Sequence, residues 1–192
     1  MNVQEATTRR LPDLKERHLP ENCRETINTI LKETYGYEQF RNLEIYDDLS
    51  KGKEKLCISQ GQLIENVILE AEKAWKGETQ VDNILLTAPT GSGKSLLFQL
   101  PAIYLGKEYN LLTIVVSPLK ALIVDQVESL QELGYTRVAY ASSDLSPEQK
   151  MEVYRQVREG EIDLFYLSPE LLLSYDIKHF VGERRIGLVV VD

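Results

Sequence analysis

The stretch ILLTAPTGSGKS at residues 84–95 has the residue types and spacing of a phosphate-binding turn. Gly91 and Gly93 have no Cβ, so the backbone can turn tightly there and approach an anion. Amides at a strand-to-helix turn can converge on a phosphate at the positive end of the helix. Lys94 would reach the β- and γ-phosphates, and the Ser95 hydroxyl would bind Mg²⁺. We therefore predict a nucleoside triphosphate site, with ATP and Mg²⁺ held by Thr90, Gly91, Ser92, Gly93, Lys94 and Ser95.

The turn differs at one position from the strict pattern G-x-x-x-x-G-K-[ST], because Ala88 stands at the first glycine. Two elements must position this turn. We expect a strand over Ile84–Ala88 before it and a helix over about 94–105 after it.

A second candidate ligand is the last residue, Asp192, which follows the apolar strand candidate Leu188–Val191. In proteins with a phosphate-binding loop, an aspartate at the end of such a strand holds Mg²⁺ opposite the loop hydroxyl. The predicted metal ligands are therefore Ser95 and Asp192, and the predicted catalytic pair is Lys94 with Asp192.

Composition excludes several classes of protein. The chain has 192 residues, a net charge of −8 and 43% hydrophobic residues, which is ordinary for a globular protein and too apolar for a disordered one. No charge-free stretch approaches the roughly 18 residues that a transmembrane span needs. The N-terminus has no apolar core for a signal peptide. Two cysteines, Cys23 and Cys57, form no disulfide framework or metal spacing, so we expect a cytoplasmic (intracellular) protein without membrane contact.

Short apolar runs alternate with amphipathic stretches from residue 83 onward, which predicts an α/β fold with a central, mostly parallel sheet flanked by helices. Further strands are expected over Leu112–Ser117, Arg137–Ala141 and Leu164–Leu167. Further helices are expected over about 119–133, 147–159 and 169–180. The sequence Ser146-Pro-Glu-Gln149 predicts a capping box at one helix start.

The segment before this pattern is polar and mainly helical. Helices are expected over 21–34 and over the amphipathic stretch Leu63–Trp75. We therefore expect an N-terminal arm and helical segment over 1–80, followed by a nucleotide-binding domain over 81–192.

Four stretches in order resemble the first RecA-like motor domain of superfamily 2 helicases of the DEAD/DEAH-box type, closest to the RecQ-like DNA helicases. APTGSGKSLLFQLPAIY (88–104) is similar to motif I, and IVVSPLKALIVDQV (114–127) resembles motif Ia. Residues 141–173 resemble the segment that includes a further nucleic-acid contact, and VVVD begins motif II. The resemblance implies a RecA-like P-loop domain that binds ATP and moves along nucleic acid, with DNA favoured over RNA.

Two Ser-Pro pairs stand at strand-to-helix junctions, where open α/β sheets bind ligands. Each could be simply a helix cap followed by a first-turn proline. Two such junctions on one sheet edge favour contacts to the phosphates of single-stranded or partly duplex nucleic acid. The predicted nucleic-acid-binding residues are Ser117, Pro118, Lys120, Ser168 and Pro169.

The resemblance also implies an upstream motif in which an aromatic residue, an arginine and a glutamine recognise adenine. The stretch Tyr35–Arg41 resembles its start, but Glu44 stands where the glutamine is expected. Either an insertion separates the parts, or the glutamine is Gln60 or Gln62; we favour Gln62, and the region of Tyr37 and Arg41 stays open.

The resemblance implies that motif II continues with a glutamate and that a second RecA-like domain supplies an arginine finger. Since neither is in this sequence, we expect an incomplete motor that does not hydrolyse ATP alone. Two other classes remain open, a P-loop kinase or nucleotide-binding module without a nucleic-acid role, and a superfamily 2 RNA helicase.

Overall fold

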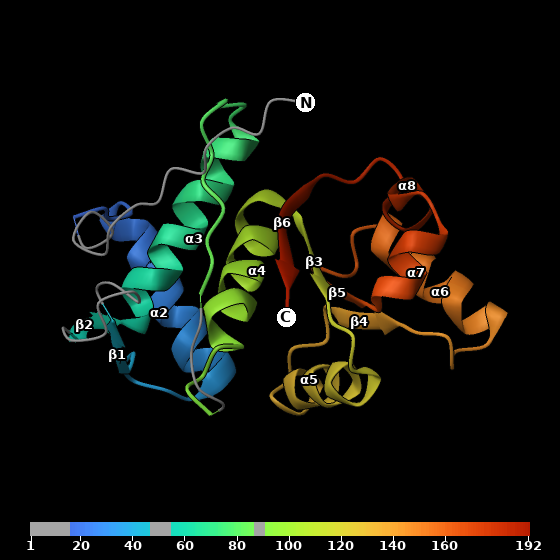
Figure 1. Cartoon of the computed structure of the whole chain (residues 1–192), viewed down its shortest axis with the longest axis horizontal. Coiled ribbons are helices and arrows are strands. Elements are labelled where there is room, and N and C mark those ends of the chain that lie inside the picture. The colour runs from blue at the N-terminus through green and yellow to red at the C-terminus, as the bar shows by residue number, and fades with distance from the viewer. Residues whose placement is uncertain (1–15, 47–54, 87–90) are drawn as a thin grey trace. The chain divides into compact units, whose positions relative to one another are not determined.

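The computed structural model describes residues 16–46, 55–86 and 91–192 (Figure 1). The chain divides into two compact units, which are described separately below. The first consists of residues 1–32 and 37–101, and the second of 33–36 and 102–192. None of the described helices is long and apolar enough to cross a membrane.

Two helices of the first unit match the expectations. Helix α2 (Glu21–Tyr35), whose last three residues belong to the second unit, buries Ile27, Ile30 and Leu31 on one face. Helix α3 (Gln60–Trp75) begins three residues earlier than its apolar repeat predicts. Its start is fixed by Ser59, whose side chain accepts a hydrogen bond from the Gly61 amide at 3.2 Å.

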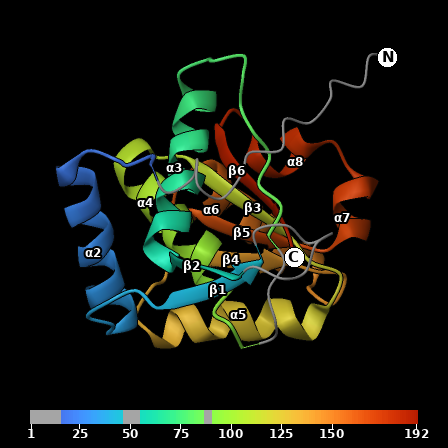
Figure 2. The same cartoon turned by 60° about the vertical axis from the view of Figure 1, so that its left-hand side comes forward.

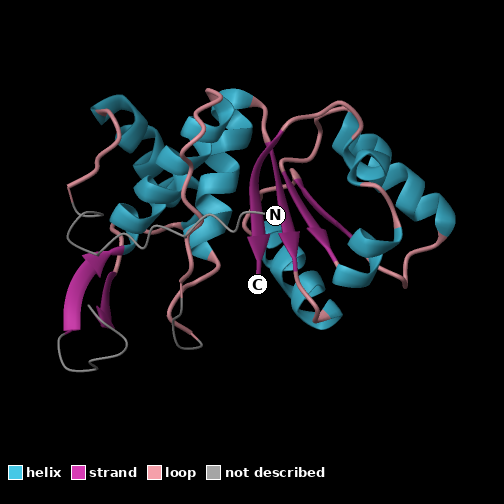
Figure 3. Cartoon of the chain, turned by 45° about the horizontal axis from the view of Figure 1, so that its top comes forward, coloured by secondary structure: helices cyan, strands magenta, loops and turns pink. Residues whose placement is uncertain are grey.

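A two-stranded antiparallel hairpin precedes α3 and was not predicted (Figure 3). Strand β1 (Asn42–Tyr46) pairs with β2 (Lys55–Ser59), and Asn42 lies opposite Ser59 at the open end. The residues between the two strands, 47–54, lie outside the described part. The chain therefore enters and leaves the hairpin at the same end.

The strand expected over Ile84–Ala88 is wrong for its described part. Residues Ile84–Leu86 have no regular secondary structure, and the Leu85 side chain is 91% exposed. Residues 87 and 88 lie outside the described part. An apolar run becomes a strand only where a neighbouring strand accepts its backbone hydrogen bonds, and the described residues offer this run no such partner.

The second unit contains a four-stranded parallel sheet, as predicted (Figure 2). Its order is β4-β5-β3-β6, so the chain crosses over between strands as in a doubly wound fold. The strands are β3 (Leu112–Val116), β4 (Val138–Ala141), β5 (Leu164–Leu167) and β6 (Ile186–Val191).

Helices connect these strands close to the expected places. They are α4 (Leu96–Tyr109), of which Ala102–Tyr109 belongs to this unit, α5 (Lys120–Glu132), α6 (Pro147–Arg158), α7 (Pro169–Ser174) and α8 (Ile177–Val181). The capping box at Ser146 is confirmed. The single helix expected over 169–180 is divided in two, because Asp176 caps a new helix by accepting from the Lys178 amide at 2.8 Å.

Helices cover both faces of the sheet, with α5 on one side and α6 and α8 on the other (Figures 1 and 2). Alternate strand residues such as Ile114 and Phe165 share a buried cluster with Tyr154 of α6 and Phe180 of α8. Burial on both faces explains why β3, β4 and β5 are apolar runs. Strand β6 is at the end of the sheet order and leaves Val189 57% and Val191 83% exposed.

A buried ionic cluster lies where the strands of the second unit begin. Asp163, 2% exposed, accepts from Arg137 at 2.6 and 2.8 Å, from Arg184 at 2.9 Å and from the Tyr135 hydroxyl at 3.1 Å. Arg184 also donates to the backbone oxygens of Val157 and Ile162. Burial and the adjacent carboxylate of Asp163 raise the pKa of Tyr135 far above its usual value. The carboxylate therefore neutralises positive charge and joins the starts of β4 and β5 to the segment before β6.

We predict that Asp163→Ala lowers the free energy of unfolding by about 3–5 kcal/mol, because removing one partner leaves the buried Arg184 charge uncompensated. The measurement is equilibrium urea unfolding followed by circular dichroism. The control is Glu161→Ala, which removes an exposed partner of Arg155 and should cost less than about 1 kcal/mol. Equal losses in the two variants would contradict the role given to this cluster.

Candidate functional site

The glycine-containing turn has the backbone conformation that the sequence predicts. Gly91 and Gly93 have φ values of 80° and 79°, a region that residues with a Cβ rarely adopt. Behind the turn, the Lys94 oxygen accepts from the Leu97 amide and the Ser95 oxygen from the Gln99 amide, both at 2.9 Å. The turn therefore leads directly into α4, although regular helix begins at Leu96. Thr90 and Ala88 lie outside the described residues.

The side chain in contact with this turn is Gln60, at the first position of α3. Its Nε2 donates to the Ser92 carbonyl at 3.4 Å, and its Oε1 accepts from the Arg41 amide at 3.1 Å. A Cβ on Gly93 would lie 2.7 Å from the same Nε2. Gln60 is 2% exposed, so this polar side chain is buried between the two segments that it bonds.

Gln62, the glutamine favoured from the sequence, has other contacts. Its Nε2 donates to the Arg17 carbonyl at 2.7 Å. The residues around Arg17 lie along α3, where the Arg17 guanidinium pairs with Glu70 at 2.6 Å and the Leu19 amide donates to Glu65 at 3.0 Å. Of the two glutamines that the sequence left open, only Gln60 bonds a residue of the phosphate-binding turn among the described contacts. Which of them reads adenine stays a prediction.

Tyr37 and Arg41, the aromatic residue and the arginine of the predicted upstream motif, lie together. The Arg41 guanidinium carbon is 5.9 Å from the centroid of the Tyr37 ring, and Tyr37 is 48% exposed. Such a pair of flat groups is suited to hold a planar ligand such as a base. Although 19 residues separate Arg41 from Gln60, the hairpin brings them together, and the Gln60 amide donates to the Arg41 oxygen at 2.9 Å.

The carboxyl edge of the parallel sheet carries a row of polar residues. Ala141, Leu167, Val116 and Val191 are in register across the four strands. The next residue of each strand is therefore at the same edge, in the order Ser142, Ser168, Ser117 and Asp192. The Asp192 amide donates to the Val116 oxygen at 3.0 Å, and the Ser117 amide to the Leu167 oxygen at 3.1 Å.

The two Ser-Pro junctions differ in detail. Ser168 caps α7, its hydroxyl accepting from the Leu171 amide at 3.4 Å, and Pro169 follows at the first helical position. Ser117 is 2% exposed, and its hydroxyl has no hydrogen-bond partner in the described part of the chain. Pro118 is exposed, and α5 begins after Leu119 without a side-chain cap. Their contact with nucleic acid stays a prediction.

Lys120 is exposed at the start of α5 but is already paired. Its Nζ lies 2.9 Å from an Asp144 carboxylate oxygen and also contacts the Ser143 hydroxyl. The hydrogen bond from Lys120 holds the pKa of Asp144 below its usual value, so Asp144 is charged at neutral pH. Asp144 and Ser142 were not predicted from the sequence, although both follow the strand expected over Arg137–Ala141.

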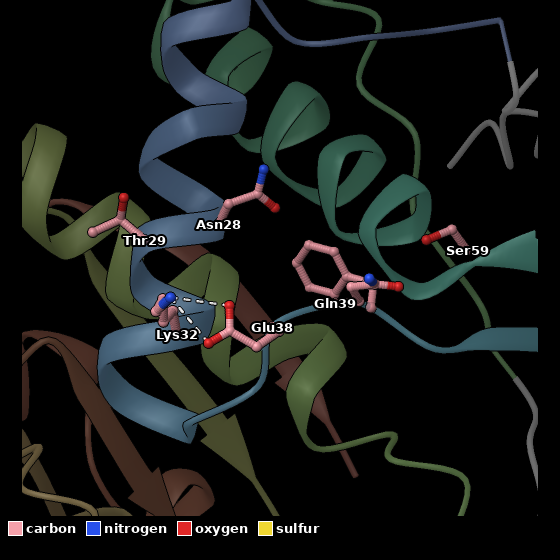
Figure 4. Close-up of a pocket in the computed structure, with 7 residues that line it drawn as sticks. Asn28, Thr29, Lys32, Glu38, Gln39 and Ser59 are labelled. Carbon is pink, nitrogen blue, oxygen red and sulfur yellow. Dashed lines mark hydrogen bonds and ion pairs between the residues drawn. The ribbon is translucent and has the colours of Figure 1, made fainter.

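A cavity of about 520 Å³ in the first unit contains none of the predicted site residues (Figure 4). It is lined by Asn28, Thr29, Lys32, Glu38, Gln39, Phe40 and Ser59. Several of its polar groups are bonded to one another or to nearby backbone, among them Lys32 with Glu38 at 2.9 Å and Thr29 with the Glu25 oxygen at 2.9 Å. The cavity is therefore no better candidate for the phosphate site than the turn itself.

The turn and the sheet edge define a P-loop protein of the α/β class. The chain matches the DEAD/DEAH box helicase family over residues 61–192, and it belongs to this family. The matched region includes all of α3 except Gln60, although residues up to 80 were expected to form a separate N-terminal segment.

Three relatives illustrate the similarity. The chain is 32% identical over 165 residues to "ATP-dependent DNA helicase RecQ" of Synechocystis, covering 86% of this chain and 28% of the relative. It is 32% identical over 169 residues to "ATP-dependent DNA helicase Q-like 5" of Arabidopsis thaliana, covering 88% and 15%. It is 30% identical over 164 residues to "ATP-dependent DNA helicase RecQ" of Bacillus subtilis, covering 85% and 22%. The chain thus spans less than a third of the length of these relatives.

We predict that Gly93→Ala destabilises the first unit more than Gly91→Ala does. Both substitutions place a Cβ on a left-handed backbone, at roughly 1–2 kcal/mol each. Only the Cβ at position 93 meets another side chain, Gln60, while the space at Gly91 is open within 4 Å. Overpacking adds about 1–3 kcal/mol. Thermal unfolding without nucleotide is the measurement, and equal midpoints in the two variants would contradict the contact.

Proposed function

We propose that this chain is the ATP-binding motor domain of a RecQ-type DNA helicase. The observation that carries the proposal is the turn at Gly91–Ser95, which has two left-handed glycines and opens α4 in a chain of the DEAD/DEAH box helicase family. Identities of 30–32% to proteins named ATP-dependent DNA helicases favour DNA over RNA.

The residues of the turn fit a triphosphate. Its left-handed glycines suit successive amides that point toward one anion, and no atom lies within 4 Å of where a Cβ on Gly91 would be. Lys94 would neutralise the β- and γ-phosphates, while Ser95 and Asp192 stay the predicted Mg²⁺ ligands. When bound, Mg²⁺ would supply charge neutralisation of the phosphate oxygens. The Tyr37–Arg41 pair would hold the base.

Single-stranded DNA would run along the carboxyl edge of the sheet. Phosphate contacts there would come from Lys120 and from the backbone around Ser117, Pro118, Ser168 and Pro169. Contacts of this kind carry no base information, which suits a motor that must move along any sequence.

Hydrolysis would need groups that these 192 residues do not contain. A glutamate after Asp192 would position the attacking water, and such a base contributes about 10²–10⁴ in rate. An arginine finger from a second RecA-like domain would contribute about 10³–10⁵. We therefore infer that this chain by itself binds ATP but does not turn it over when DNA is added.

The test of ATP binding is fluorescence titration of the 192-residue chain with a methylanthraniloyl derivative of ATP in the presence of Mg²⁺. Lys94→Ala should weaken binding at least about tenfold, since hydrogen bonds to charged groups contribute about 1.5–3 kcal/mol each. The control, Lys107→Ala, removes an exposed lysine of α4 and should bind as the unaltered chain does. Phosphate release, measured in the same samples with single-stranded DNA added, should stay at background.

Several results would contradict the proposal. Binding unaffected by Lys94→Ala would exclude the P-loop as the site, and DNA-stimulated turnover that Lys94→Ala abolishes would exclude the inferred dependence on a second domain. ATP binding without salt-dependent binding of DNA would favour the nucleotide-binding module. Preference for RNA of the same sequence would favour the RNA helicase.

We predict that Asp144→Asn strengthens the binding of single-stranded DNA. The Asp144 carboxylate competes with DNA phosphate for Lys120. Removing its charge therefore frees the Lys120 ammonium group and also removes a negative charge that repels DNA. Affinity for a fluorescent oligodeoxythymidine should rise about threefold to tenfold at low salt, and Lys120→Ala should remove the gain.

The matched control for Asp144→Asn is Glu128→Gln, which makes the same change in net charge at an exposed position farther along α5. Glu128→Gln should change the affinity for single-stranded DNA by less than half of the gain expected for Asp144→Asn. Fluorescence anisotropy at several salt concentrations measures both variants. An equal gain in both variants would mean that only the net charge affects DNA binding and that Lys120 makes no specific contribution to it.

A further inference from the structure

A stacked pair of aromatic side chains lies at the surface of the second unit, where α7 ends and α8 begins. The rings of Tyr175 and His179 are nearly parallel, with an interplanar angle of 16° and 4.9 Å between their centroids. Tyr175 is 53% exposed, and His179 is also exposed. Neither residue was predicted from the sequence to belong to a site.

The inner ring of the pair, His179, is fixed to the core of this unit. Tyr154 of α6 contacts the His179 ring at 5.4 Å. The Phe180 ring is perpendicular to both members of the pair, 5.5 Å from His179 and 6.0 Å from Tyr175. Because Phe180 is close to both rings, it lies beside the pair and not on the outer face of Tyr175. Tyr154 and Phe180 are buried, so Tyr175 is the outermost ring of a stack that rests on the core.

The backbone also holds Tyr175 in place. Tyr175 is the one residue between Ser174, which ends α7, and Asp176, which caps α8. The Asp176 carboxylate accepts from the Lys178 amide at 2.8 Å, so the chain is fixed directly after the tyrosine. A ring that is ordered before the ligand arrives can stack a planar group at a smaller entropic cost than a mobile side chain.

Helix α7 joins this pair to the carboxyl edge of the sheet, along which DNA would run (Figure 1). The helix begins after Ser168 and ends before Tyr175, so at about 1.5 Å per residue these two residues lie about 10 Å apart. This is the length of about three stacked nucleotides. Lys178 is exposed near the pair, and its ammonium group forms no ion pair with a carboxylate in the described part of the chain. An open aromatic face beside a cation is the combination that binds single-stranded nucleic acid.

We propose that Tyr175, supported by His179, is a platform on which one base of single-stranded DNA stacks, with a neighbouring phosphate close to Lys178. This inference rests on the proposed DNA-binding function and adds a contact to a base to the phosphate contacts at the sheet edge. Every base has a flat aromatic face, so such a contact holds the strand without selecting its sequence.

Stacking and phosphate contacts respond differently when the bases are removed from the strand. A lysine binds the phosphates of an abasic strand as well as those of an ordinary one, whereas a stacking platform needs the base. The ratio of the affinities for an oligodeoxythymidine and for an abasic strand of the same length therefore measures the stacking contact alone.

The experiment measures this ratio by fluorescence anisotropy for the 192-residue chain and two variants of one residue. Tyr175→Leu removes the ring and keeps an apolar side chain, while Tyr175→Phe keeps the ring. Tyr175→Leu should weaken oligodeoxythymidine binding about fivefold or more, which corresponds to the loss of one stacked base. Its affinity for the abasic strand should stay within about twofold of the unaltered chain. Tyr175→Phe should bind both strands as the unaltered chain does.

Two further variants separate stacking from other effects of the same surface. Leu173→Ala removes an apolar side chain of α7 that is 86% exposed, and it should leave the ratio unchanged because leucine has no aromatic face. Lys178→Ala should weaken the binding of both strands by the same factor and lower the salt dependence by the equivalent of about one phosphate contact.

The outcomes distinguish this inference from the proposed function. If the unaltered chain binds neither strand, the proposed DNA binding fails. If Lys120→Ala weakens binding but Tyr175→Leu does not, or if Tyr175→Leu weakens both strands equally, the platform alone is overturned. The same holds if Tyr175→Phe binds as weakly as Tyr175→Leu. Should Tyr175→Leu not fold, as judged by circular dichroism, Tyr175→Trp must raise the ratio, since its larger ring offers more stacking area; an unchanged or lower ratio overturns the platform.

Discussion

Parallel pairing of four short strands is the constraint on which the sheet-edge residues depend. Because Val116 is in register with both Leu167 and Val191, the residues that follow these strands must lie at one edge. Ser117, Ser168 and Asp192 are far apart in the sequence, and the strand register brings them to one edge. Backbone hydrogen bonds, such as that from the Asp192 amide to the Val116 oxygen, set this register.

Polar groups have different environments at the two ends of the parallel strands. At the edge where the strands begin, Asp163 is buried and satisfied by Arg137, Arg184 and Tyr135. At the edge where they end, Lys120 and Asp144 are exposed and paired with each other, while the Ser117 hydroxyl is buried and has no partner among the described residues. A satisfied buried network stabilises a fold, whereas exposed groups can exchange partners with a ligand at little cost.

Features that depend on local sequence could be predicted, and features that depend on distant partners could not. Leu164–Leu167 is a strand at the predicted bounds because four apolar residues are buried on both faces. The capping box at Ser146 needs only residues three apart. By contrast, Ile84–Leu86 is as apolar as any strand but has no described neighbour to pair with. Gln60 and Gln62 could not be separated from the sequence because their contacts are with Ser92 and Arg17.

The hairpin β1–β2 lies between the predicted upstream motif and the phosphate-binding turn and lengthens the sequence between them. Arg41 and Lys94 are 53 residues apart, but Asn42 and Ser59 are paired at the open end of the hairpin. The chain therefore enters and leaves the hairpin at one end, where hydrogen bonds join Arg41 before the hairpin to Gln60 after it. Closing a loop of this length costs little more entropy than closing a shorter one. The chain can thus be longer here while Arg41 stays joined to the start of α3, through its bonds to Gln60 and through the pairing of β1 with β2.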